Sequence, residues 1–183
     1  MSTALARAVF LDRDGVLNRA EVREGRPHPP ATPADVVLLD GVVDACRRLH
    51  DDGWLLIVVT NQPDIARGTT TVAEVDAINA VVVADLPVDE VVVCPHDDAD
   101  DCGCRKPAPG MLVDAATRWG IDLGRSVMVG DRWRDIEAGE RAGTATVFID
   151  AGYDERRPEH PDHVVASLAE AATIIVDRAK VAP

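Results

Sequence analysis

The segment Ala8-Val9-Phe10-Leu11-Asp12-Arg13-Asp14-Gly15 joins a short apolar run to two carboxylates two residues apart. The apolar run predicts a buried strand, and the carboxylates would lie just beyond its end. Such a pair can hold Mg²⁺, and one member can accept a phosphoryl group as an acyl phosphate. Taken alone, the segment fits a plain metal site or a solvated turn equally well.

Apolar runs rich in valine and isoleucine alternate with helical patterns along the rest of the chain. This alternation is typical of an α/β fold, a doubly wound parallel sheet with helices on both faces. The predicted strands are 8–11, 54–59, 88–93, 126–130 and 144–149, with a last short strand near Val164 and Val165. The predicted helices are 41–52, 71–85, 109–119, 133–142 and 167–178.

The length of 183 residues, 46% of them hydrophobic, suits one compact domain covering residues 1–183. Two stretches resist regular structure. Residues 19–34, which we call the flap, contain Gly25 and several prolines, and residues 94–110 combine prolines with clustered cysteines. Neither stretch is long enough to form a second domain.

The charge and the lack of long apolar runs restrict the partners. The formal net charge of −13 repels nucleic acid at long range. No apolar run is long enough to span a membrane, and residues 1–8 lack the apolar core of a signal peptide. We therefore expect a soluble cytoplasmic protein that binds neither nucleic acid nor membrane. We also expect a monomer, since the sequence shows no exposed apolar helix face.

Polar groups follow four successive predicted strands. Besides the first pair of carboxylates, they are Thr60-Asn61-Gln62, Arg105-Lys106-Pro107 and Gly130-Asp131. Because ligands of a parallel sheet bind beyond the carboxyl ends of its strands, these groups should share one edge. Singly, each has an ordinary explanation, such as a turn cap or a solvated charge. Together, in order and with the residue types of a phosphoryl site, they favour a functional site.

A second group of residues points to a different metal. Cys94-Pro95-His96 is followed after five residues by Cys102-Gly103-Cys104. Three thiolates and one imidazole make a closed tetrahedral set for Zn²⁺, which predicts a structural rather than a catalytic zinc. The alternative is free thiols in a flexible loop, but the many aspartates between the cysteines would leave that loop unfolded without metal. We call residues 94–104 the zinc loop.

The four strand-end motifs resemble those of the haloacid dehalogenase (HAD) superfamily of aspartate-nucleophile phosphatases. They are Asp12-Arg13-Asp14-Gly15, Thr60, Lys106, and Gly130-Asp131 with Asp135, and the resemblance spans residues 8–150. It implies a Rossmann-like core in which Asp12 is the nucleophile and Asp14 the general acid and base. It also implies that Mg²⁺ is held by Asp12, Asp131 and the backbone carbonyl of Asp14.

The resemblance also implies roles for the remaining polar residues. Thr60 and Lys106 would contact the transferred phosphoryl group. Asp135 would hydrogen-bond Lys106 or metal-bound water, although an acid at a helix N-terminus is an alternative reading. Arg132 would support the site beside Asp131. The residues assigned to substrate binding are Arg13, Asn61, Gln62 and Arg105.

The zinc loop narrows the resemblance to one branch, which holds the D-glycero-D-manno-heptose-1,7-bisphosphate 7-phosphatases and the histidinol-phosphate phosphatases. Ile65-Ala66-Arg67-Gly68 and Pro109-Gly110-Met111 are more like the heptose enzymes. The short span between His96 and Cys102 is instead like the histidinol-phosphate enzymes, and Pro63-Asp64 departs from the heptose pattern. The implied substrate is a small sugar phosphate, first the 7-phosphate of heptose 1,7-bisphosphate and alternatively histidinol phosphate.

The intervals between the motifs leave no room for a cap domain, so we expect an open site suited to direct hydrolysis. The flap, especially Ala20 to Arg23, would line its entrance, and Arg105 would contact the distal part of the substrate. His28 receives no role. A noncatalytic phosphate-binding module is the competing class, and it is disfavoured by the presence of both Asp12 and Asp14.

Overall fold

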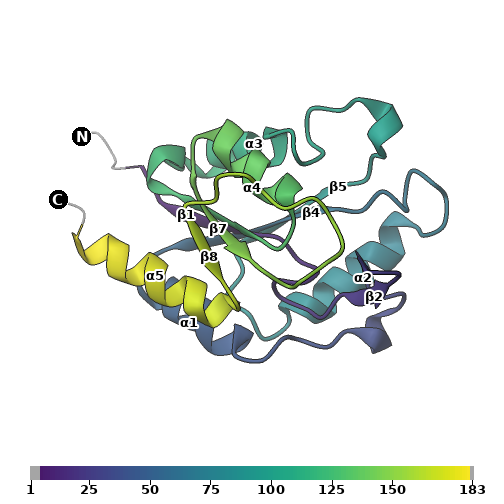
Figure 1. The fold of residues 1–183 in the computed structure, drawn as a ribbon, viewed down its shortest axis with the longest axis horizontal. Helices are drawn as coiled ribbons and strands as arrows, with labels where there is room; N and C mark the ends of the chain where they lie inside the picture. Colours follow the sequence, from purple (N-terminus) through teal and green to yellow (C-terminus); the bar gives the residue numbers. More distant parts are fainter. Residues whose placement is uncertain (1–4, 182–183) are drawn as a thin grey trace.

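The strands form one parallel sheet with the first strand near its centre. The computed structural model describes residues 5–181, and Figure 1 shows their arrangement. The strand order is β5-β4-β1-β6-β7-β8, with every neighbouring pair parallel. The strands are Ala8–Leu11 (β1), Leu55–Asn61 (β4), Glu90–Cys94 (β5), Val127–Gly130 (β6), Ala145–Ile149 (β7) and His163–Val165 (β8). The prediction of a doubly wound parallel α/β fold is confirmed.

Helices cover both faces of this sheet. They are Val42–Asp51 (α1), Val72–Val83 (α2), Gly110–Trp119 (α3), Trp133–Ala142 (α4) and Leu168–Val181 (α5). In Figure 1, α1 and α5 lie on one side of the sheet and α3 and α4 on the other. Helix α2 belongs with α1 and α5, because its Ile78 and Val82 share an apolar cluster with Leu49 and Ala172.

The central strand is buried on both faces. Val9 and Leu11 belong to the cluster beneath α1, α2 and α5, whereas Ala8 and Phe10 belong to the cluster beneath α3 and α4. All four side chains are fully buried, as the alternation of side chains along a strand requires. Only the carboxyl end of β1 is therefore left for polar chemistry, and Asp12 is the next residue.

The predicted boundaries agree with the observed ones to within a few residues. The boundary difference that matters most for the site is in β4, which continues to Asn61 instead of ending at residue 59. Thr60 and Asn61 are therefore the last residues of a strand and not part of the following loop. Their backbones pair with Val93 and Cys94 of β5, which fixes their positions at the edge of the site.

The flap is more ordered than expected. It contains an antiparallel hairpin of Glu21–Arg23 (β2) and Arg26–His28 (β3), followed by a short 3₁₀ helix, Pro33–Asp35 (η1). The hairpin turns at Glu24 and Gly25, whose φ angles are 50° and 76°. Two-residue turns with positive φ match the twist of paired strands. A glutamate in such a turn gives no sequence signal, and Pro27 argued against a strand.

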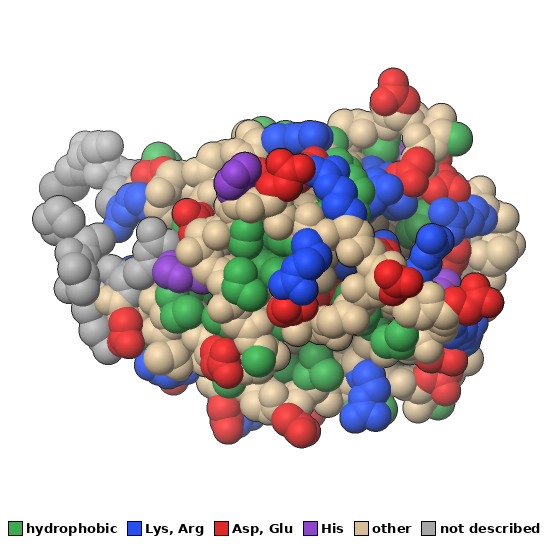
Figure 2. All heavy atoms as spheres, in the orientation of Figure 1, with side chains coloured by type: hydrophobic (Ala, Val, Ile, Leu, Met, Phe, Trp, Pro, Cys, Tyr) green, Lys and Arg blue, Asp and Glu red, His purple; other side chains and the backbone are tan. Residues whose placement is uncertain are grey.

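The surface carries charges of both signs. Figure 2 shows acidic and basic side chains interspersed over the visible face, with apolar side chains between them. Within residues 5–181, no helix combines the length and apolar character needed to cross a membrane. Two further 3₁₀ helices, Asp98–Asp100 (η2) and Leu123–Arg125 (η3), lie in loops.

Replacing Gly139 in α4 with alanine should destabilise the protein, although alanine is the better helix former by about 1 kcal/mol. A Cβ at Gly139 would lie 2.7 Å from the Cβ of Met128 in β6 and 2.9 Å from Thr144 and Thr146 atoms. We expect Gly139→Ala to lower the free energy of unfolding by roughly 1–3 kcal/mol, measured by urea denaturation. Glu140→Ala, exposed on the same helix, is the control and should change it by less than about 0.5 kcal/mol. A stabilised Gly139→Ala would contradict this packing.

Candidate active site

Lys106 occupies the centre of the site. Its Nζ lies 2.8 Å from Asp12 Oδ1 and 2.6 Å from Asp135 Oδ1, and it donates a hydrogen bond of 2.8 Å to the Val59 carbonyl. The side chain is only 2% exposed. Burial lowers the pKa of Lys106, but the two carboxylates outweigh burial and raise it above its ordinary value. The ammonium therefore stays charged and holds Asp12 at the end of β1.

Asp12, Asp131 and Asp135 crowd together beside this ammonium. One carboxylate oxygen of each lies within 4.8 Å of the others. Burial raises the pKa of Asp12 to about 6, with Lys106 opposing and Asp135 adding to the rise. Burial, followed by the charges of Asp12 and Asp135, also raises the pKa of Asp131 well above its ordinary value. Three buried carboxylates with one ammonium leave an excess of negative charge that a divalent cation would balance.

The surroundings of Asp131 fit such a cation. Both carboxylate oxygens of Asp131 are buried, and neither accepts a hydrogen bond of ordinary geometry from the described residues, although the Tyr153 hydroxyl is close enough to lower the pKa of Asp131. A Cβ at Gly15 would lie 1.8 Å from Asp131 Oδ2, so the carboxylate fits only because residue 15 is a glycine. Oxygen ligands without competing partners are what Mg²⁺ binds in proteins. The residues present therefore fit the Mg²⁺ expected from the sequence.

Asp135 serves both of the roles considered for it. One oxygen pairs with Lys106, and the other accepts a hydrogen bond of 3.0 Å from the Arg132 backbone N–H at the start of α4. It is thus a helix N-terminal acid and a partner of Lys106 at once. The Arg132 guanidinium points elsewhere and pairs with Glu155.

Three side chains donate hydrogen bonds to the Asp14 carboxylate. Arg13 donates two hydrogen bonds to it, of 3.1 and 2.8 Å, Asn18 donates one of 3.0 Å, and Gln62 donates one of 3.0 Å. Arg13 is only 1% exposed, and its third contact is a 2.7 Å hydrogen bond to Asn79 of α2. The structure therefore does not bring Arg13 into the pocket as a substrate-binding residue. Its guanidinium is used to orient Asp14.

The residues at the end of β4 tie the site together. The Gln62 amide that reaches Asp14 also donates a hydrogen bond of 2.9 Å to Thr60 Oγ1. The Asn61 side chain forms a reciprocal pair with the Lys106 backbone, donating to its carbonyl at 3.0 Å and accepting from its N–H at 3.1 Å. Thr60, Asn61 and Gln62 all line the pocket, and Asn61 also fixes the backbone that carries Lys106.

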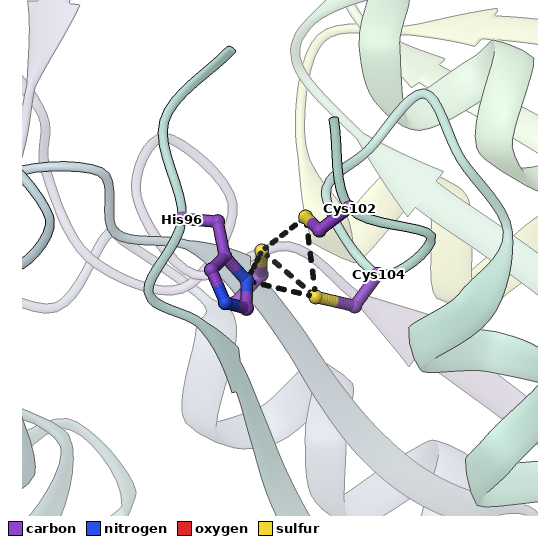
Figure 3. A group of neighbouring side chains, drawn as sticks. His96, Cys102 and Cys104 are labelled. Carbon is purple, nitrogen blue, oxygen red and sulfur yellow. Dashed lines mark hydrogen bonds between the residues drawn. The ribbon is translucent and has the colours of Figure 1, made fainter. Parts of the chain in front are cut away.

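The zinc ligands expected from the sequence lie together. Figure 3 shows His96, Cys102 and Cys104 pointing toward one another, and Cys94 completes the group. The S–S and S–N distances range from 3.1 to 3.7 Å. Zinc bonds of about 2.3 Å give tetrahedral edges of roughly 3.8 Å, so these four atoms fit Zn²⁺ with little movement.

The zinc loop carries charged side chains to the pocket rim. Asp98 pairs with Arg105 at 2.8 Å and with Arg134 of α4 at 3.1 Å. Arg67, from the loop after β4, pairs with Asp97 at 2.7 Å and with Asp64 at 3.3 Å. The zinc-loop carboxylate Asp98 is therefore shared by two guanidinium groups, whereas Arg67 is shared by two carboxylates, so this part of the rim holds three arginines and three aspartates.

A cavity of about 370 Å³ extends from Asp12 to this rim, a volume ordinary for small-molecule sites. Residues 26–29 of the flap line it, whereas Ala20 and Val22 line a different cavity. The expectation that Ala20 to Arg23 would line the entrance is therefore wrong. Four further pocket residues were not evident from the sequence, because their places depend on the hairpin, on the packing of α4 and on the loop after β7: Arg26, His28, Arg134 and Glu155. The abundance of arginine around the motifs could have indicated Arg26 and Arg134, but no sequence signal pointed to His28 or Glu155.

The chain is similar in sequence and in fold to known phosphatases. The HAD-hydrolase-like family matches residues 103–171. The D-glycero-beta-D-manno-heptose-1,7-bisphosphate 7-phosphatase of Salmonella typhi is 35% identical over 188 residues, covering 94% of this chain and 97% of that protein. The Bordetella bronchiseptica protein of that name is 35% identical over 151 residues, covering 80% of this chain and 82% of its own.

The chain belongs to this family of HAD phosphatases. The crystal structure of the D,D-heptose 1,7-bisphosphate phosphatase from B. bronchiseptica, complexed with magnesium and phosphate, has a TM-score of 0.75. It is 31% identical and covers 94% of this chain and 99% of its own. A putative HAD-like phosphatase from Mesorhizobium loti has a TM-score of 0.79, also at 31% identity, over 95% of this chain and 87% of its own.

Asn79 should matter to this HAD phosphatase although it does not line the pocket. Asn79→Ala removes the acceptor of the buried Arg13 guanidinium, which should cost about 1–3 kcal/mol of stability and loosen the hold on Asp14. We expect kcat for an alkyl phosphate to fall roughly 10- to 100-fold, with a smaller change in KM. Asp76→Ala, exposed on the same helix, is the control. Equal kcat values for the two variants would contradict the orienting role of Arg13.

The zinc loop should contain about one zinc ion per chain, measured by elemental analysis of the purified protein. Cys104→Ser should lose this zinc, and phosphatase activity should fall because Lys106 is only two residues away. Cys46→Ala is the matched control, since Cys46 is fully buried in the apolar core far from the cluster in sequence, and burial raises its pKa to about 12. An active, zinc-free wild-type protein would refute the zinc assignment.

Proposed function

We propose that this chain is a Mg²⁺-dependent phosphatase that removes the 7-phosphate of D-glycero-D-manno-heptose 1,7-bisphosphate through an aspartyl-phosphate intermediate. One observation carries the proposal. The buried Asp12 carboxylate is fixed by Lys106 at one end of a pocket whose other end is rich in arginine. A nucleophile beside two further buried carboxylates that could share a divalent cation suits phosphoryl transfer, and the arginines suit a second anionic group.

In the first half of the reaction, an oxygen of Asp12 forms a bond to phosphorus while the bond from phosphorus to the sugar oxygen breaks. Asp14 donates a proton to that leaving oxygen. In the second half, Asp14 takes a proton from water as the water oxygen attacks phosphorus, and the bond between Asp12 and phosphorus breaks to release inorganic phosphate. Asp14 thus returns to its starting protonation state.

The other residues position these two carboxylates and the phosphate. Lys106 contacts Asp12 directly and would neutralise a phosphoryl oxygen beside it. The Thr60 hydroxyl already accepts from Gln62, so its proton is free to be donated to a phosphoryl oxygen. When bound by Asp12, Asp131 and the Asp14 carbonyl, Mg²⁺ would offset the repulsion between the nucleophile and the phosphate dianion. Asp135 and Arg132 support this arrangement.

The heptose substrate is supported by the names of the relatives and by the arginines around the distal end of the pocket. Arg105 lies at that end and would contact the distal part of the substrate, close to Asn61 and Gln62 on the β4 side. From the length, charge and hydropathy pattern of the sequence, we further propose that the protein is a single-domain monomer of the cytoplasm. A relative from Thermosynechococcus vestitus, 36% identical, is named without an anomer, so both anomers enter the test.

Turnover of both heptose 1,7-bisphosphate anomers should be compared with that of histidinol phosphate at saturating Mg²⁺. We expect kcat/KM to be roughly 10- to 100-fold higher for at least one heptose bisphosphate, because its second phosphate adds charge-assisted hydrogen bonds. Asp12→Asn should show no phosphate release on any substrate while keeping the wild-type circular dichroism.

Three results would contradict the proposal in different ways. A preference for histidinol phosphate would assign the enzyme to the other branch. Phosphate release by Asp12→Asn near the wild-type rate would refute the nucleophile, and no release by the wild-type protein on any substrate would leave a noncatalytic phosphate-binding module.

A further inference from the structure

The tip of the flap hairpin contacts the loop after β7 beside the pocket. The Asp154 backbone N–H, in the loop after β7, donates a hydrogen bond of 2.9 Å to the Gly25 carbonyl. The contact is close, because a Cβ at Gly25 would lie 2.7 Å from the Cβ of Asp154. The next residue along the loop, Glu155, lines the pocket and pairs with Arg132. The Gly25–Asp154 contact therefore joins two segments that border the same cavity.

This contact determines where the residues after the turn are placed. Arg26 and His28 are alternate residues of β3, so their side chains leave the strand on the same side. Both line the pocket, together with the two prolines Pro27 and Pro29. The proline rings restrict the backbone on either side of His28. The hairpin thus presents a guanidinium to the pocket on a stiffened strand.

Arg26 differs from the other basic residues of the pocket. Lys106, Arg67, Arg105, Arg132 and Arg134 each pair with at least one carboxylate. Among residues 5–181, no carboxylate lies within ion-pair distance of Arg26 in the contacts described. A phosphate that binds Arg26 would not have to displace an existing partner. A guanidinium suits this task, since it can donate two parallel hydrogen bonds to one phosphate.

We propose that Arg26, placed by the Gly25–Asp154 contact, binds the second phosphate of the substrate and sets the preference for a sugar bisphosphate over the corresponding monophosphate. This inference rests on the proposed function and adds a residue from the flap to the distal end of the pocket. The second phosphate would lie between the flap and the zinc-loop rim, both of which border the one cavity.

The test compares kcat/KM for heptose 1,7-bisphosphate and heptose 7-phosphate, which lose the same phosphate. Arg26→Ala should lower the value for the bisphosphate roughly 10- to 100-fold, mainly through KM. The value for the monophosphate should change by less than about twofold, because the chemical step does not use Arg26. Arg23→Ala is the matched control. Arg23 lies opposite Arg26 in the hairpin, pairs with Glu21 and does not line the pocket, so the bisphosphate preference should survive.

A second variant tests whether the Gly25–Asp154 contact places Arg26. Gly25→Ala should weaken the bisphosphate preference in the same direction as Arg26→Ala, because the added methyl group meets Asp154. Gly68→Ala is the control for backbone strain, since Gly68 also has a positive φ, of 71°, but an added Cβ would have no neighbour within 4 Å. An unchanged preference in Gly25→Ala would overturn the placing role of the tip contact.

The remaining outcomes separate this inference from the proposed function. A wild-type preference for the bisphosphate that survives in Arg26→Ala overturns the inference alone. Efficient hydrolysis of monophosphates by the wild-type protein, without any preference for the bisphosphate, overturns both the inference and the heptose bisphosphate assignment. Loss of the preference in Arg26→Ala but not in Arg23→Ala supports the inference.

Discussion

The structure of the site depends on one buried ammonium. Lys106 joins the ends of three elements, since it contacts Asp12 after β1, the Val59 carbonyl in β4 and Asp135 in α4. A lysine this deeply buried is unfavourable without charged partners, and these two carboxylates would repel each other without the lysine. Each group is therefore stable only because the others are present. The same contacts that hold these elements together also orient the Asp12 carboxylate.

The backbone of Lys106 is fixed as firmly as its side chain. On one side, Asn61 binds both its N–H and its carbonyl. On the other side, Cys104 belongs to the Cys₃His cluster, and the zinc loop is further held because the Gly110 N–H donates to the Gly103 carbonyl at 3.0 Å. A long, flexible side chain gains precision only when its backbone cannot move. A zinc ion bound by this cluster would restrict an otherwise acidic, irregular loop beside the pocket.

The sequence predicted the elements whose signal is local. The valine-rich runs and the helical patterns placed the strands and helices to within a few residues, and the order of motifs placed Asp12, Thr60, Lys106 and Asp131 at one sheet edge. The zinc ligands were evident from their residue types and spacing. The direction of Arg13 was not predictable in this way, because it depends on Asn79, 66 residues further along the chain. The hairpin was missed for a different reason, since its turn uses a glutamate at positive φ and its second strand contains a proline.

The residues that the sequence predicts are those proposed to act on the phosphoryl group. The residues that it does not predict are those proposed to contact the rest of the substrate. Residues that move the phosphoryl group must lie at strand ends, where the sheet fixes them and where sequence motifs reveal them. Residues that would contact the rest of the substrate lie on the flap, the zinc loop and the loop after β7, which surround the cavity in place of a cap domain. Their positions depend on contacts between loops, such as that of Gly25 with Asp154. A fold of this kind can change the molecule it recognises by changing loop contacts alone, while the ammonium and the carboxylates around it stay the same.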